Sequence, residues 1–96
     1  MRIHLRAVLD VAAVLGGKEH TPDIREGTSV GELLSALFAL HGERLAALLL
    51  EKDEPMTLLP HMRIYINGRG LDFLDGFATV LHEDDDVMIM PQLSGG

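Results

Sequence analysis

The chain has 96 residues, with 15 acidic and 8 basic side chains, a formal net charge of −7 and no cysteine. This length predicts one domain, and the absence of cysteine excludes disulfides and cysteine metal sites. The acidic balance disfavours nucleic acid and anionic membranes as partners, because like charges repel. No apolar run is long enough to span a bilayer, and the first residues, which include Arg2 and His4, read as the start of a strand and not as a signal peptide with a cleavage site, so we expect a cytoplasmic protein.

The N-terminal part predicts two strands separated by a short helical or turn segment. Alternation predicts a half-buried first strand, whose inward residues would be Ile3, Leu5, Ala7 and Leu9. Residues 10–16 read as the helical or turn segment, closed by Gly16-Gly17. Residues 18–24 read as a second strand, which we expect at a sheet edge because Pro22 has no N–H to donate.

The clearest pattern is that of a helix beginning after Ser29. Ser29 and Glu32 have the spacing of a capping box, and Gly42 is a stop signal. One apolar stripe follows the helical period, formed by Val30, Leu33, Leu34, Leu37 and Phe38. We expect a second short helix over residues 43–50, with Leu45, Leu48 and Leu49 pointing inward, and then a loop over 51–60.

Two further strands, with a weak strand between them, are predicted in the C-terminal part. Residues 62–66 alternate, and Asn67-Gly68 follows as a hairpin turn. Residues 70–81 are irregular, with expected anchors Leu71, Phe73, Leu74, Phe77, Val80 and Leu81. An acidic turn over 82–86 leads to the last strand, 87–90, which Pro91 ends. This order predicts a two-layer α+β domain with a mixed four- to five-stranded sheet and one main helix packed on one face.

Two features near the end of the sequence suggest chemistry. A carboxylate on Gly96 would become an acyl donor once adenylated, and Gly95-Gly96 could pass through a narrow enzyme site because glycine has no Cβ; the alternative is an ordinary frayed terminus. If Val87 and Ile89 face the core, Met88 and Met90 face outward, with Leu93 beyond them. These side chains would form an adaptable docking surface; the alternative is that a loop covers them. The histidine spacings and the acidic run match no metal site, so we expect no metal, no bound cofactor and no catalytic side chain.

Four segments resemble the MoaD/ThiS sulfur-carrier family over nearly the whole length. Residues 28–34 resemble its helix start, 66–69 its strand-to-turn motif, 73–79 the FLxGLxT segment of longer MoaD-like members, and 86–96 its closing strand and tail. The resemblance implies a β-grasp (ubiquitin-like) fold, as a single domain over 1–96 with a flexible tail over 91–96.

The resemblance also implies a mechanism. An adenylating enzyme of the ubiquitin-activating (MoeB/ThiF-like) type would use ATP to activate Gly96, and sulfur would then convert it to a thiocarboxylate. Inserted into a MoaE-like large subunit of molybdopterin synthase, the tail would donate sulfur to a pterin precursor of the molybdenum or tungsten cofactor. Gly96 would bear the sulfur and Gly95 would permit passage. The partner-binding residues would be Met88, Met90, Pro91, Leu93 and Ser94.

Departures from the family pattern leave the acceptor open. Residues 91–94 read Pro-Gln-Leu-Ser where Pro-Pro-Val-Ala is commoner, and Asp84-Asp85 stands where Asp-Gly is frequent. The alternatives are a ubiquitin-like protein modifier, a sulfur carrier for thiamine or another metabolite, and an interaction module with an inert tail.

Overall fold

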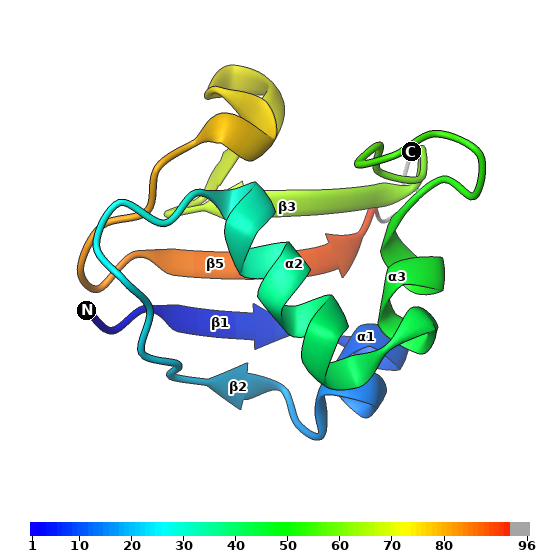
Figure 1. Ribbon diagram of the computed structural model, residues 1–96, viewed down its shortest axis with the longest axis horizontal. Helices are drawn as coiled ribbons and strands as arrows, with labels where there is room; N and C mark the ends of the chain where they lie inside the picture. The colour runs from blue at the N-terminus through cyan, green and yellow to red at the C-terminus, as the bar shows by residue number, and fades with distance from the viewer. Residues whose placement is uncertain (93–96) are drawn as a thin grey trace.

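Five strands form one mixed sheet in a computed structural model that describes residues 1–92. The strand order is β2-β1-β5-β3-β4 (Figure 1). The strands are β1 (His4–Ala7), β2 (Glu19–His20), β3 (Met62–Ile66), β4 (Arg69–Gly70) and β5 (Asp86–Pro91). β1 and β5 run parallel in the middle, and the other pairs are antiparallel. This arrangement confirms the predicted mixed sheet.

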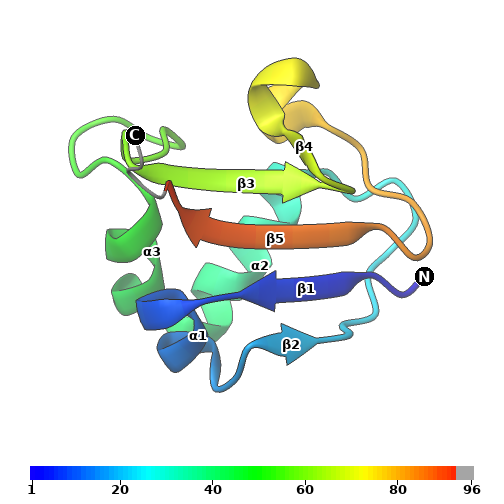
Figure 2. The same cartoon turned by 180° about the vertical axis from the view of Figure 1, so that it is seen from behind.

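The main helix lies across one face of the sheet, and the opposite face has no helix over it (Figures 1 and 2). The helices are α1 (Leu9–Leu15), α2 (Val30–His41) and α3 (Glu43–Leu49), and two short 3-10 turns cover Leu71–Phe73 and Gly76–Ala78. No helix in the described part of the chain is long and apolar enough to cross a membrane. The sheet therefore has one covered face and one open face.

A capping box fixes the start of α2, as the sequence predicts. The Glu32 backbone N–H donates to Ser29 Oγ at 3.1 Å, and the Ser29 N–H donates to Glu32 Oε1 at 3.0 Å. The two bonds satisfy donors that a helix start leaves without partners. Gly42 caps the C-terminal end with φ 75°. The predicted boundaries of this helix are confirmed.

The core lies between α2 and the covered face of the sheet. Alternate residues of the three central strands are buried, namely Leu5, Ala7, Met62, Ile64, Ile66, Val87 and Ile89. From the helices they meet the expected stripe of α2 and the two fully buried residues Leu45 and Leu49 of α3. Leu48, which we expected inward, is half-buried at the margin of this core. The predicted alternation is confirmed in β3 and β5, and in β1 as far as Ala7.

The turn and the last strand differ in how well they follow the prediction. Asn67 (φ 53°) and Gly68 (φ 83°) both have the positive φ of a type I′ hairpin, as expected.

The last strand is longer than predicted: β5 continues through Pro91, which pairs with Met62. Proline is tolerated there because its nitrogen points toward β1, which has already ended at Ala7. The start predicted for the tail, residue 91, is thus wrong by at least one residue.

Three apolar residues expected inside are exposed. Leu9 is 67% exposed because it does not continue β1. It begins α1 with φ 56°, and this left-handed residue turns the chain out of the strand alternation. Phe73 is 85% exposed and lies at the end of a 3-10 turn. Val80 is exposed as well, because it forms an extended bridge with Ser29 in which its neighbours Thr79 and Leu81 are the buried residues. The second strand is also shorter than predicted, although it does lie at the sheet edge.

Candidate functional site: the open face and the end of β5

The open face presents a central methionine flanked by long polar side chains. Met88 of β5 is in register with Arg6 of β1 on one side and Tyr65 of β3 on the other. Met90 is in register with Arg63 of β3. Figure 2 views the sheet from this side, with α2 behind it. The result is an apolar strip along β5 with polar neighbours on both sides.

The methionines lie on the face that the sequence predicts. Val87 and Ile89 are buried under α2, while Met88, Met90 and Pro91 are half-buried. Thioether side chains in such positions can adapt to the shape of a partner. Their assignment as partner-binding residues remains a prediction. The other expected residues of this site, Leu93, Ser94, Gly95 and Gly96, lie outside the described part of the chain.

An ion pair spans the strands at the start of β5. Arg6 Nε donates to Asp86 Oδ1 at 2.8 Å, and Arg6 Nη2 donates to Asp86 Oδ2 at 2.7 Å. These hydrogen bonds, followed by the negative charge of Asp86, raise the pKa of Arg6 above its ordinary value. The arginine side chain is 44% exposed, so the pair orients a fixed positive group on the open face and adds little stability.

The other end of β5 is held by Arg63. Its Nη1 donates to the carbonyl oxygens of Pro60 at 2.7 Å and Met62 at 2.8 Å, and its Nη2 donates to the side-chain oxygen of Gln92. The Gln92 N–H in turn donates to the His61 carbonyl. The last described residue is thus fixed through both its backbone and its side chain. The described part of the chain thus ends at a fixed position close to Met90.

The acidic run before β5 is held in place by hydrogen bonds within the turn and to Asn67. Asp85 accepts hydrogen bonds from Asn67 Nδ2 at 2.9 Å and from the His82 N–H at 2.8 Å. The Asp86 N–H donates to Asn67 Oδ1 at 2.9 Å. The hydrogen bonds of the Asp85 carboxylate therefore order the segment that leads into β5. Within residues 1–92, no group of three or more metal-binding side chains comes together.

Sequence reasoning missed the two arginines of the open face. Arg6 and Asp86 are separated by 80 positions, and Arg63 and Gln92 by 29. Neither pair has a local spacing that identifies it. The one available signal is that Arg6 and Arg63 fall at outward positions of predicted strands, which places them on the same face as the methionines.

This architecture defines a class of protein. The strand order, the helix on one face and the parallel central pair are those of a β-grasp, ubiquitin-like domain, and the site lies where its last strand ends. The chain belongs to the ThiS family, whose model matches residues 10–96. The resemblance to ubiquitin-like sulfur carriers is thereby confirmed.

Individual relatives agree with this assignment. The chain is 33% identical over 96 residues to small archaeal modifier protein 3 of Haloferax volcanii, and the match covers both chains completely. It is 31% identical over 71 residues to a putative sulfur carrier protein of Archaeoglobus fulgidus, covering 74% of this chain and 77% of the relative. The crystal structure of small archaeal modifier protein 1 of H. volcanii has a TM-score of 0.76 at 21% identity, covering 96% and 98% of the chains, and this likeness shows the fold.

Proposed function

We propose that this protein is a sulfur carrier, with the sulfur held as a thiocarboxylate on Gly96. The observation that carries the proposal is the ThiS family match, which extends past the anchored end of β5 and includes Gly95 and Gly96. In this function, other enzymes bind the folded domain and act on the carboxyl group of Gly96.

The chemistry takes place in two balanced steps. A Gly96 carboxylate oxygen attacks the α-phosphorus of ATP, and pyrophosphate leaves, which gives an acyl-adenylate. A sulfide equivalent then attacks the acyl carbon, the bond to AMP breaks, and a proton is lost to solvent. The product is a thiocarboxylate, and a separate adenylating enzyme of the MoeB/ThiF type supplies the ATP site. This chain contributes the acyl group and the surface that the enzyme recognises.

Recognition is proposed to use the strip along β5. Met88 and Met90 are half-buried on the open face, and the half-buried Pro91 follows them, one residue before the point where Gln92 is anchored. A partner that covers this strip removes apolar area from water and at the same time positions the tail. The strip suits both an adenylating enzyme and a MoaE-like acceptor subunit.

The acceptor we propose is a pterin precursor of molybdopterin, reached through that large subunit. Support comes from residues 73–79, which resemble a segment typical of MoaD-like chains. A second candidate is conjugation to lysine side chains of other proteins. It is favoured by the full-length, 33% match to a relative named as a modifier protein. Both functions share the adenylate, and they differ in the nucleophile that consumes it.

Intact-mass spectrometry separates these functions. The protein is incubated with its cognate adenylating enzyme, ATP and sulfide, and the C-terminal peptide is sequenced. Exchange of one oxygen for sulfur on Gly96 supports the carrier. Adducts joined through lysine to other proteins support the modifier. An unchanged C-terminal peptide in the presence of the active cognate enzyme contradicts both.

Two variants connect the reaction to the proposed residues. Deletion of Gly96 should abolish the mass change and leave the melting temperature unaltered, because a terminal residue contributes little to stability. Met88→Lys should slow adenylation, whereas Leu40→Lys should not, because Leu40 is exposed on α2, on the opposite side of the sheet. Equal rates for the two lysine variants would remove β5 from the recognition surface.

A further inference from the structure

Arg63 joins three segments of the chain at the end of β5. Its guanidinium donates to the connection between α3 and β3 (residues 50–61) at Pro60, to the start of its own strand at Met62, and to the last described residue at Gln92. The three acceptors are neutral oxygens, so the contact depends on the planar fork of the arginine and not on charge pairing. The half-buried side chain thus ties the end of β5 to that connection.

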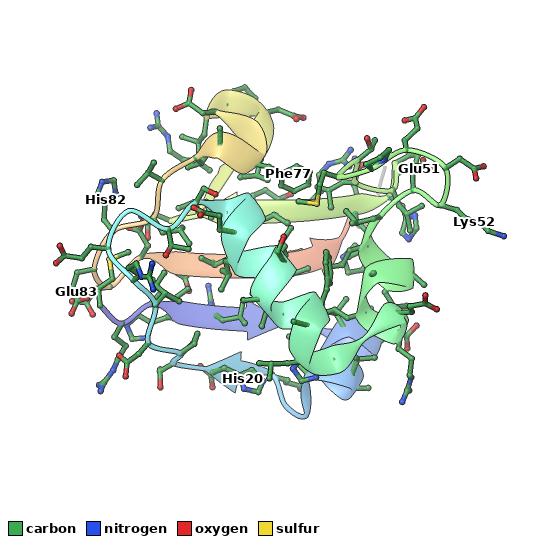
Figure 3. All side chains as sticks on the ribbon, in the orientation of Figure 1. His20, Glu51, Lys52, Phe77, His82 and Glu83 are labelled. Carbon is green, nitrogen blue, oxygen red and sulfur yellow. The ribbon has the colours of Figure 1, made fainter. Side chains whose placement is uncertain are left out.

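The connection between α3 and β3 is itself fixed to the core. The Leu59 N–H donates to the Leu49 carbonyl at 2.8 Å, and Leu49 is fully buried in α3. An antiparallel bridge closes the same connection. Figure 3 marks it by Glu51 and Lys52, which project at the end of the sheet where β5 finishes. The carbonyl groups to which Arg63 donates therefore have defined positions relative to the core.

The end of β5 needs this support because its own pairing is weak there. β1 ends opposite Ile89, so beyond that residue β5 has a neighbouring strand on one side only. Pro91 pairs with β3 but has no N–H to donate. The backbone hydrogen bond that follows runs from the Gln92 N–H to the His61 carbonyl. Exposed hydrogen bonds at the end of a strand open readily, so the contacts of Arg63 decide how firmly residue 92 is held.

The position of residue 92 limits the reach of the proposed reacting group. Gly96 is four positions after Gln92 in the sequence, and four residues span at most about 14 Å. If the end of β5 opens back to Met90, six residues separate the fixed strand from Gly96, and the reach grows to about 20 Å. The effective concentration of an attached group falls as the −3/2 power of the length of the free segment or more steeply, so this opening lowers it about two- to threefold.

On the basis of the sulfur-carrier function proposed above, we infer that Arg63 is a positioning residue for the adenylation of Gly96. It acts through Gln92, which it holds at a fixed place relative to Met88 and Met90. An adenylating enzyme that binds the strip along β5 then meets the carboxyl group within the reach of four residues. Binding of the domain and delivery of its carboxyl group therefore depend on different side chains.

ATP–pyrophosphate exchange with the cognate adenylating enzyme measures these two contributions separately. Arg63→Met keeps an apolar stem and removes the donors, so at saturating concentrations of this protein it should lower kcat about two- to threefold and leave KM unchanged. Met88→Lys should give the opposite result, a raised KM with kcat unchanged. Arg25→Met is the matched control, because Arg25 is exposed in the connection between β2 and α2, and it should change neither constant.

Two further variants distinguish the geometry of the arginine from its charge. Arg63→Lys retains the positive charge but not the planar arrangement of donors, so its kcat should fall as in Arg63→Met. Gln92→Ala removes the acceptor of the same contact, and the double variant Arg63→Met/Gln92→Ala should therefore be no slower than Arg63→Met alone. A wild-type kcat in the lysine variant, or additive losses in the double variant, would contradict positioning through Gln92.

Nitrogen-15 relaxation of the free protein tests the anchoring without any enzyme. The backbone order parameter of Gln92 should be near that of a rigid backbone, about 0.85, in the wild-type chain and in Arg25→Met, and it should be lower in Arg63→Met. Circular dichroism at the assay temperature shows whether each variant is folded, so that a change in kcat is not ascribed to unfolding. Equal order at Gln92 in the wild-type chain and in Arg63→Met would overturn the inference whatever the kinetics show.

The wild-type chain shows whether the reaction itself takes place. Absence of pyrophosphate exchange with the wild-type chain would contradict the proposed function, and with it any role of Arg63 in that reaction. Exchange by the wild-type chain with an unchanged kcat in Arg63→Met would overturn the positioning role alone. A raised KM with an unchanged kcat in Arg63→Met would make Arg63 part of the surface that the enzyme binds, contrary to the inference.

Discussion

Replacement of Ser29 by alanine tests whether the capping box stabilises the whole domain. The substitution removes Ser29 Oγ, the acceptor of the Glu32 N–H, while the backbone N–H of residue 29 can still donate to Glu32 Oε1. Such a change typically costs about 1 kcal/mol. In a domain of this size, that loss lowers the melting temperature by about 4–8 °C. The first turn of α2 also supports the fully buried Val30, so we expect the loss to appear in global unfolding.

The assay is urea denaturation followed by circular dichroism, with Ser35→Ala as the matched control. Ser35 is exposed in the middle of the same helix, where alanine is the better helix former. The control should therefore be neutral or slightly stabilising. If Ser29→Ala and Ser35→Ala shift the urea midpoint equally, or if neither shifts it, the stabilisation assigned to the cap is refuted.

Three other substitutions probe the fold. Ile89→Ala, in the fully buried centre of β5, should lower the free energy of unfolding, measured by urea denaturation, by about 2–5 kcal/mol. Met88→Ala on the same strand should lower it clearly less, because that side chain is half-buried. Equal losses would contradict the assignment of the two faces. Gly68→Ala should destabilise the hairpin by about 1 kcal/mol because φ there is 83°, which thermal unfolding can measure. Leu9→Gly should raise the melting temperature, because glycine adopts the positive φ of this exposed position without the steric strain that leucine has there. An unchanged or lower melting temperature would argue against strain at this position.

The parts of the fold that sequence predicts well are those with a local physical signature. Ser29 and Glu32 are three residues apart and can satisfy each other without information from the rest of the chain. Asn67-Gly68 likewise encodes its turn through the two residue types that tolerate positive φ. Alternation in β5 predicts which methionines face outward because the period of a strand is two.

The errors arise where periodicity stops or where contacts are distant in the sequence. Leu9 continues the alternation of β1 in the sequence, but its backbone leaves the strand in the structure. Phe73 lies in 3-10 turns, whose short length gives no period from which burial can be read. The anchoring of Gln92 by Arg63 depends on the β3–β5 register, which no local pattern specifies.

The middle position of β5 has a consequence for biosynthesis. β5 is the last of the five strands to be translated, yet it fills the gap between β1 and β3. A nascent or truncated chain lacking residues 86–91 would leave the facing edges of β1 and β3 without a partner strand. Unpaired strand edges promote aggregation. Folding must then await a contact between the opening and closing segments of the domain, which slows it. Partner enzymes that recognise β5 would consequently encounter their substrate only after the domain has closed.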